Sequence, residues 1–112
     1  MGVAALYSNT TANNNTAVGY RAARSNTTGT LNTIMGNDAL YTNTTGAYNT
    51  ALGTLAGDAI TTGNSNTMLG FNSGGATTTA SQNVAVGQSA LAANTTGASN
   101  VAVGAESLLA NT

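Results

Sequence analysis

The sequence predicts an all-β fold, a parallel β-solenoid (β-roll) in which each turn of the chain is one repeat of 17 residues. Three observations support this fold: an uninterrupted repeat, a glycine in every copy, and Asn and Thr residues that return at fixed positions. Numbered from its Asn, the repeat has the consensus N-T-A-V-G-x-x-A-L-x-x-N-T-T-G-x-x. Residues 1–112 therefore form a single array of about six and a half repeats.

The glycine at position 5 of the repeat argues against helices and favours short strands. Seventeen residues are too few for a pair of helices, and a Gly inside a helix costs about 1 kcal/mol relative to Ala. Gly adopts backbone angles that other residues resist, which suits a turn between strands. Equivalent strands would stack about 4.8 Å apart and give a rod about 30 Å long. The position 5 glycines are Gly19, Gly36, Gly53, Gly70, Gly87 and Gly104.

The Asn at position 1 is constant, and we expect its amide groups to hydrogen-bond from coil to coil as a ladder. The adjacent threonines at positions 13 and 14 are expected to form similar ladders, because β-branched residues favour strands. The expected ladder asparagines are Asn15, Asn32, Asn49, Asn66, Asn83 and Asn100.

Positions 3 and 4 are both apolar, and so are positions 8 and 9, although neighbouring residues of a strand face opposite sides. A single thin coil has only one interior. We therefore expect position 4, such as Val18, to fill the coil, and position 3, such as Ala17, to face a neighbouring chain. This arrangement predicts a homo-oligomer, and a trimer is favoured.

The two ends of the array also suggest assembly. The chain starts with Met1 at position 4 and stops with Thr112 at position 13, and neither end resembles the polar cap that repeat arrays need. We expect the chain to be a window of a longer fibre, or a unit that continues end to end into a filament.

The composition argues against most catalytic and binding functions. The chain has two arginines, three acidic residues, no His, no Cys and a net charge of −1. Nucleic-acid binding needs a basic patch and membrane insertion needs about 20 consecutive apolar residues, so neither is expected. Asp38, Asp58 and Glu106 lie in different repeats, which argues against acid–base catalysis and against a metal site. We predict that the chain is not an enzyme and has no catalytic residue, no metal ligand and no cofactor.

Two stretches, NTTANNNTAVGYRA and NTTGAYNTALG, resemble the tandem repeats of phage and prophage tail-fibre proteins. More loosely, the chain resembles the head domain of trimeric autotransporter adhesins, where Asn-Ser-x-Ala-x-Gly motifs build a left-handed parallel β-roll from slightly shorter repeats. Both resemblances imply a trimeric fibre that is extracellular, on a cell surface or on a virion surface.

The expected function is a structural and adhesive module: the stiff, protease-resistant shaft of a bacterial surface filament or phage tail fibre. Two alternatives remain open, an ice-binding solenoid with Thr rows and a functional amyloid subunit. The adjacent threonines argue against ice binding, because neighbours in a strand face opposite sides.

Several surface residues could carry recognition. Arg21 and Arg24 could contact an anionic cell-surface glycan, or could be solvated surface charges. Exposed aromatic residues could stack on sugars or cover oligomer contacts. Glycans on Thr would help to solvate a fibre with so little charge, and the position 13 threonines are possible acceptors: Thr10, Thr27, Thr44, Thr61, Thr78 and Thr95. The Asn-x-Thr sequences at Asn9, Asn14, Asn26, Asn43 and Asn94 are interpreted as turn and ladder residues rather than glycosylation sites.

Overall fold

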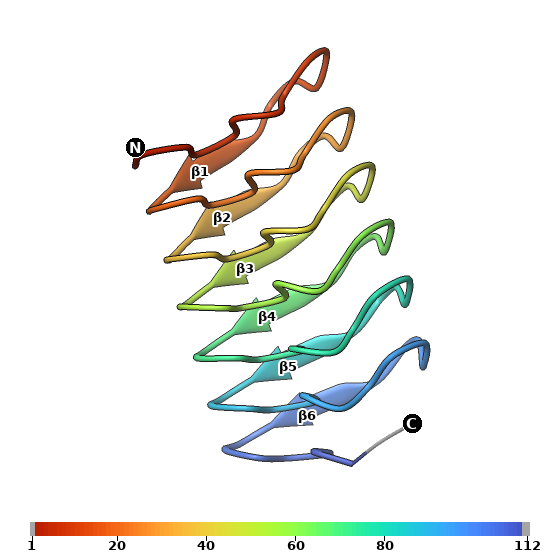
Figure 1. The fold of residues 1–112 in the computed structure, drawn as a ribbon. Helices are drawn as coiled ribbons and strands as arrows, with labels where there is room; N and C mark the ends of the chain where they lie inside the picture. Colours follow the sequence, from red (N-terminus) through yellow and green to blue (C-terminus); the bar gives the residue numbers. More distant parts are fainter. Residues whose placement is uncertain (1, 111–112) are drawn as a thin grey trace.

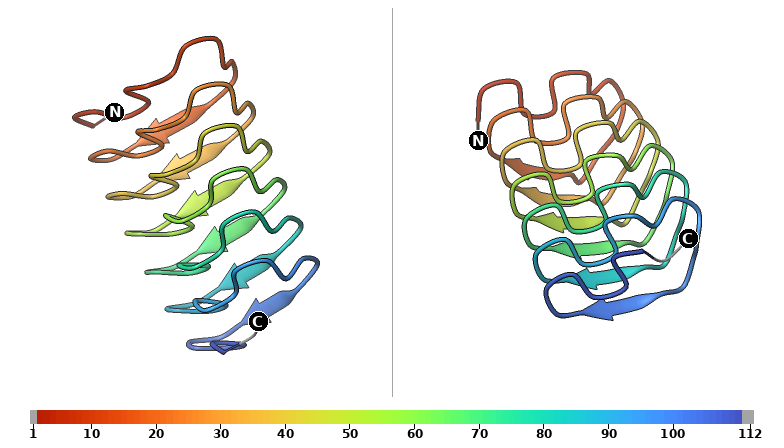
Figure 2. Two further views of the ribbon diagram at one scale, coloured as in Figure 1. Left: turned by 45° about the vertical axis from the view of Figure 1, so that its right-hand side comes forward. Right: turned by 60° about the horizontal axis from the view of Figure 1, so that its bottom comes forward.

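The structure, a computed structural model, describes residues 2–110 as a β-solenoid with one 17-residue repeat per coil. Met1 and Thr112, which continue the repeat in the sequence, lie outside the described residues. Short strands stack in register along one side of the coils (Figure 1), and the two further views show the rest of each coil returning beside them (Figure 2). The predicted all-β parallel solenoid is confirmed. The strands are β1 Thr16–Val18, β2 Thr33–Met35, β3 Thr50–Leu52, β4 Thr67–Leu69, β5 Val84–Val86 and β6 Val101–Val103.

The six strands form one parallel sheet in sequence order. Each residue pairs with the equivalent residue of the next repeat, so that Thr16 lies beside Thr33 and Ala17 beside Ile34. The solenoid measures 34 × 21 × 16 Å along its principal axes. The register of the sheet is thus set by the sequence repeat itself.

The prediction that position 4 fills the coil and position 3 faces outward is wrong, because the strand has the opposite orientation. Ala51 and Met68, both at position 3, are completely buried, whereas Met35 at position 4 is 54 % exposed. Alternation along a strand places positions 1 and 3 on one side and positions 2 and 4 on the other. The Asn at position 1 bonds to backbone groups inside the coil, and position 3 therefore points inward with it.

Positions 8 and 9 both point into the coil, so they do not require a second buried surface. Ala39 and Leu40 are adjacent and both are fully buried. Leu40 has a φ of 51°, in the left-handed region, and this turn breaks the alternation of an extended chain. The apolar pair that suggested a neighbouring chain is accommodated within a single coil.

Three positions of each repeat, 7, 9 and 17, adopt a left-handed backbone in residues 2–110. No Val, Ile or Thr occupies any of them, although these residues are abundant elsewhere in the chain. A β-branched side chain is a poor fit to positive φ, which explains this exclusion. The turns also redirect backbone donors: Asp38 N–H donates to the Tyr20 carbonyl of the preceding coil, and Leu40 N–H to the Ala56 carbonyl of the following one.

Substitution at one left-handed position provides a direct test. Ser65 is exposed and has a φ of 58°. Ser65→Gly is expected to raise the free energy of unfolding by up to about 1 kcal/mol, because Gly tolerates this angle. Ser65→Val is expected to lower it by about 1–2 kcal/mol. Urea unfolding followed by circular dichroism measures both changes, and equal stabilities of the two variants would contradict the assignment.

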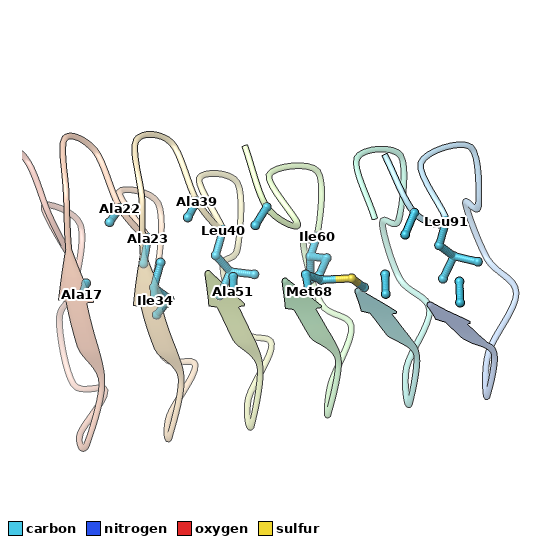
Figure 3. Close-up of a cluster of buried hydrophobic side chains, with 14 residues drawn as sticks. Ala17, Ala22, Ala23, Ile34, Ala39, Leu40, Ala51, Ile60, Met68 and Leu91 are labelled. Carbon is cyan, nitrogen blue, oxygen red and sulfur yellow. The ribbon is translucent and has the colours of Figure 1, made fainter. Parts of the chain in front are cut away.

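The two repeats that depart most from the consensus compensate for their own changes in volume (Figure 3). Gly57 and Gly74 replace the Leu of position 9, and larger side chains occupy the space. A Cβ added to Gly57 would lie 2.9 Å from Ile60 Cδ1, and one added to Gly74 would lie 2.5 Å from Met68 Sδ. Ile60 and Met68 are both fully buried. The deviation is therefore a repacking of the core across neighbouring coils.

Candidate functional site

The position 1 asparagines point into the coil from the start of each strand. Those from Asn15 to Asn83 each bond to a backbone carbonyl of their own coil and to a backbone N–H of the next coil. Asn49 is 1 % exposed; its Nδ2 donates to the Gly63 carbonyl at 2.8 Å, and its Oδ1 accepts from the Asn66 backbone N–H at 2.9 Å. Side chain to side chain bonds are longer, 3.2 Å from Asn66 Nδ2 to Asn49 Oδ1. The ladder thus runs mainly from amide oxygen to the next backbone N–H.

A second ladder of buried asparagines runs through position 12, in agreement with the interpretation of Asn26 and Asn43 as turn and ladder residues. Asn43 Nδ2 donates to Asn26 Oδ1 at 2.7 Å and to the Gly46 carbonyl at 3.0 Å. The same carbonyl accepts from Asn32 Nδ2 at 2.9 Å, so the two ladders meet at position 15. Ile60 interrupts the second ladder, and Asn43 Oδ1 is a buried acceptor without a partner. The recurrence of Asn at position 12 was the available signal.

The position 5 glycines stand where each strand ends and the chain turns away. Gly53 has a φ of 131°, which lies outside the region available to side-chain-bearing residues. A Cβ there would lie 2.8 Å from the carbonyl carbon and oxygen of Gly70 in the next coil. Both the backbone angle and the close stacking of coils therefore require glycine at this position.

Five of the position 13 threonines, which were predicted as possible glycan acceptors, use their hydroxyl groups in hydrogen bonds to the next coil. Thr27 Oγ1 donates to the Thr44 carbonyl at 3.0 Å, and Thr44 Oγ1 to the Thr61 carbonyl at 3.2 Å. The equivalent bonds start from Thr10, Thr61 and Thr78. These hydroxyl groups link adjacent coils. Because they already donate to protein carbonyls, they are poorly placed to match an ice surface. Of the Asn-x-Thr asparagines, Asn26, Asn43 and Asn94 are buried.

One surface of the solenoid carries no charge and exposes apolar side chains among Thr, Asn, Gln and Ser. We define the outer sheet face as the outward side chains of positions 2 and 4 of β1–β6, flanked by positions 17 and 6. None of these positions holds a charged residue in any repeat. The face includes Met35 and Leu52 from the strands, Tyr48 from position 17, which is 61 % exposed, and Phe71 from position 6. Large apolar side chains exposed together on an uncharged face are typical of an interaction site.

The charged residues lie on the return path of the coils, at positions 7 and 10. Arg21 forms a bidentate ion pair with Asp38, at 2.7 and 2.8 Å, and its guanidinium lies over the rings of Tyr20 and Tyr41 at 4.9 and 5.0 Å. The hydrogen bonds to Asp38 raise the pKa of Arg21. Arg24 lies 5.3 Å from the centre of the Tyr7 ring. We refer to these two arginines with Tyr7, Tyr20, Tyr41 and Asp38 as the arginine–tyrosine cluster.

Asp58 occupies the same repeat position as Arg24 and Tyr41, and its carboxylate is half-buried. One carboxylate oxygen is buried without a hydrogen-bond partner. Burial raises the pKa of Asp58, partly offset by backbone hydrogen bonds. The folded protein therefore favours the neutral form of this carboxyl group.

The raised pKa of Asp58 predicts a pH-dependent penalty on stability. The neutral Asp58 carboxyl group stabilises the folded state relative to its ionised form. This contribution is full below the unfolded pKa of about 3.9, and it is lost as the pH rises through the higher pKa of the folded state. Asp58→Asn cannot ionise, so relative to wild type it should gain urea resistance between pH 3 and pH 7. Thr62→Asn, an exposed substitution that changes no titratable group, is the control and should show no such gain. A relative loss of urea resistance for Asp58→Asn over this range would contradict the assignment.

Comparison of the chain with protein-family models, curated proteins and solved structures gives no match. Within residues 2–110, no helix is long and apolar enough to cross a membrane. The same residues contain no cluster of three or more acidic, His or Cys side chains that could hold a metal ion, and no pocket. The candidate sites are therefore two surfaces, the outer sheet face and the arginine–tyrosine cluster.

Proposed function

We propose that this chain is a structural repeat module that forms the shaft of an extracellular fibre, on a cell or virion surface, by side-to-side association of several copies. The observation that carries the proposal is the outer sheet face, which has no charged residue along the length of the solenoid and exposes large apolar side chains such as Met35, Tyr48 and Phe71. The fold is consistent with a structural repeat module, since continuous pairing of β1–β6 along one axis produces a stiff rod.

The size of the outer sheet face fits a stable interface between copies. The solenoid is 34 Å long and 21 Å across its wider cross-section, so that one side covers about 700 Å², close to the roughly 800 Å² per partner of standard interfaces. Sheets whose strands are all parallel are usually covered on both faces. A second copy of the same chain is the partner we propose, because both surfaces would then be uncharged and expose apolar side chains.

The proposed interface replaces the one expected from the sequence. Position 4 and its outward neighbour at position 2 would meet the partner, while position 3 remains inside the coil. Arg24, Tyr7 and Tyr41, at position 10 on the return path, would stay uncovered in such an assembly. Tyr20, at position 6, flanks the interface. Arg21 and Arg24 are the only basic residues in the chain, which also supports a shaft that trypsin cuts poorly.

The oligomeric state tests this proposal. Sedimentation velocity over a range of concentrations should give an oligomer, and its mass should distinguish the trimer implied by the tail-fibre resemblance from a dimer. Leu52→Glu places a charge at the centre of the outer sheet face and should give a folded monomer. Thr62→Glu, on the exposed return path, is the matched control and should leave the oligomer intact. A monomeric wild type, or equal dissociation by both variants, would overturn the proposal.

A further inference from the structure

Both arginines and all four tyrosines lie within three consecutive coils, and three of the tyrosines contact an arginine, whereas the remaining coils are almost uncharged. The repeat consensus requires none of these residues. Equivalent positions in other copies hold varied residues, such as Leu55, Asn72 and Ser89 at position 7, and the core of residues 2–110 contains neither Arg nor Tyr. The arginine–tyrosine cluster is therefore an addition to the scaffold.

The two arginines are in different situations. Arg21 is committed to Asp38 through two short hydrogen bonds and lies against two tyrosine rings. Arg24 has no carboxylate partner among residues 2–110, and its one hydrogen bond is to the Tyr41 hydroxyl at 3.4 Å. A guanidinium has five N–H donors in a fixed fork, so Arg24 retains donors for a ligand.

Tyr7 supplies the second component of a site. Its ring is 72 % exposed, with the Arg24 guanidinium 5.3 Å from the ring centre. The stacking contact holds the cation beside a flat apolar surface that also carries a hydroxyl group. A ligand that suits both would combine a carboxylate, for the guanidinium fork, with a ring whose C–H groups pack on the aromatic surface.

We infer that Arg24 and Tyr7 form a binding site for a hexuronic acid residue of an acidic polysaccharide. The carboxylate accepts hydrogen bonds from the Arg24 guanidinium, and the sugar ring packs against Tyr7. Arg21 and Asp38 hold Tyr41, which in turn contacts Arg24, and thereby position the guanidinium. The site does not depend on self-association, since every residue belongs to one chain and lies away from the outer sheet face.

The test uses the whole chain and three probes: tri-galacturonic acid, the uncharged galactose trisaccharide, and sodium sulfate at equal ionic strength. Titration followed by amide and guanidinium NMR signals should give a dissociation constant on the order of 1 mM for tri-galacturonic acid, as expected for an open single-chain site. Shifts should centre on Arg24 and Tyr7. The neutral trisaccharide and sulfate should each bind at least about tenfold more weakly.

Variants separate binding from structural effects. Arg24→Gln and Tyr7→Ala should each weaken binding of tri-galacturonic acid by about tenfold while the melting temperature stays within a few degrees of wild type. Leu109→Ala removes an exposed apolar side chain at the same repeat position, in a coil without Arg, and should bind like wild type. The inference is overturned if wild type does not bind, if sulfate binds as well as the uronate, or if Arg24→Gln binds unchanged.

Discussion

Replacing Asn49 with Ala is expected to lower the free energy of unfolding by about 3–5 kcal/mol, the largest effect of any single polar truncation. The change removes the bond to the Gly63 carbonyl and the acceptor of the Asn66 backbone N–H. Both groups lie in the solenoid interior, and each unpaired buried group costs about 1–3 kcal/mol. Ile60 stands where a second Asn would otherwise serve Gly63, so the neighbouring ladder cannot substitute.

Urea unfolding monitored by circular dichroism measures this loss. Asn13→Ala is the matched control, because Asn13 is exposed and its side chain has no hydrogen-bond partner among residues 2–110. It should change stability by less than about 0.5 kcal/mol. Asn49→Asp provides a further comparison, since a carboxylate can accept from Asn66 but an ionised one cannot donate to Gly63. Similar stabilities for Asn49→Ala and Asn13→Ala would mean that the ladder does not stabilise the fold.

Replacing Gly53 with Ala is expected to cost about 2–5 kcal/mol. The φ of 131° imposes backbone strain of about 1–3 kcal/mol on any residue with a side chain, and the new methyl group meets the Gly70 carbonyl at 2.8 Å. Overpacking against a neighbouring coil adds about 1–3 kcal/mol.

Gly97→Ala is the control for Gly53→Ala, because Ala12 and Ala80 already stand at its position 15 in other repeats. The shift in urea midpoint should be several times larger for Gly53→Ala. Equal effects of the two substitutions would show that backbone geometry does not require Gly at position 5.

The fold class could be predicted because the 17-residue period constrains every coil to the same path. The orientation of the strand could also have been predicted, but the apolar residues alone were ambiguous. Thr33 and Met35 lie on the same side of β2, and Asn32 and Ile34 on the other. The constant Asn, rather than the larger apolar residue, marks the interior, because its amide must pair with backbone groups there.

The left-handed turns, the compensating core residues and the Arg21–Asp38 pair could not be predicted from residue propensities alone. The only sequence signal for the left-handed turns is that positions 7, 9 and 17 never hold a β-branched residue. The compensation of Gly74 by Met68 joins a return segment to the strand of its own coil, a contact that depends on how the coil closes. The pairing of Arg21 with Asp38 is a coil-to-coil contact at one repeat position, and the period could have indicated it.

Thiol labelling of neighbouring residues in β3 tests most directly which side of the strand is inside and which meets another chain. The chain has no native cysteine, so Ala51→Cys and Leu52→Cys each introduce a single thiol. The thiol of Ala51→Cys should be protected in the folded protein at every concentration. The thiol of Leu52→Cys should react rapidly in dilute protein and become protected as copies associate. Rapid labelling of folded Ala51→Cys, with Leu52→Cys protected even in dilute protein, would contradict the orientation of the strand and the proposed assembly.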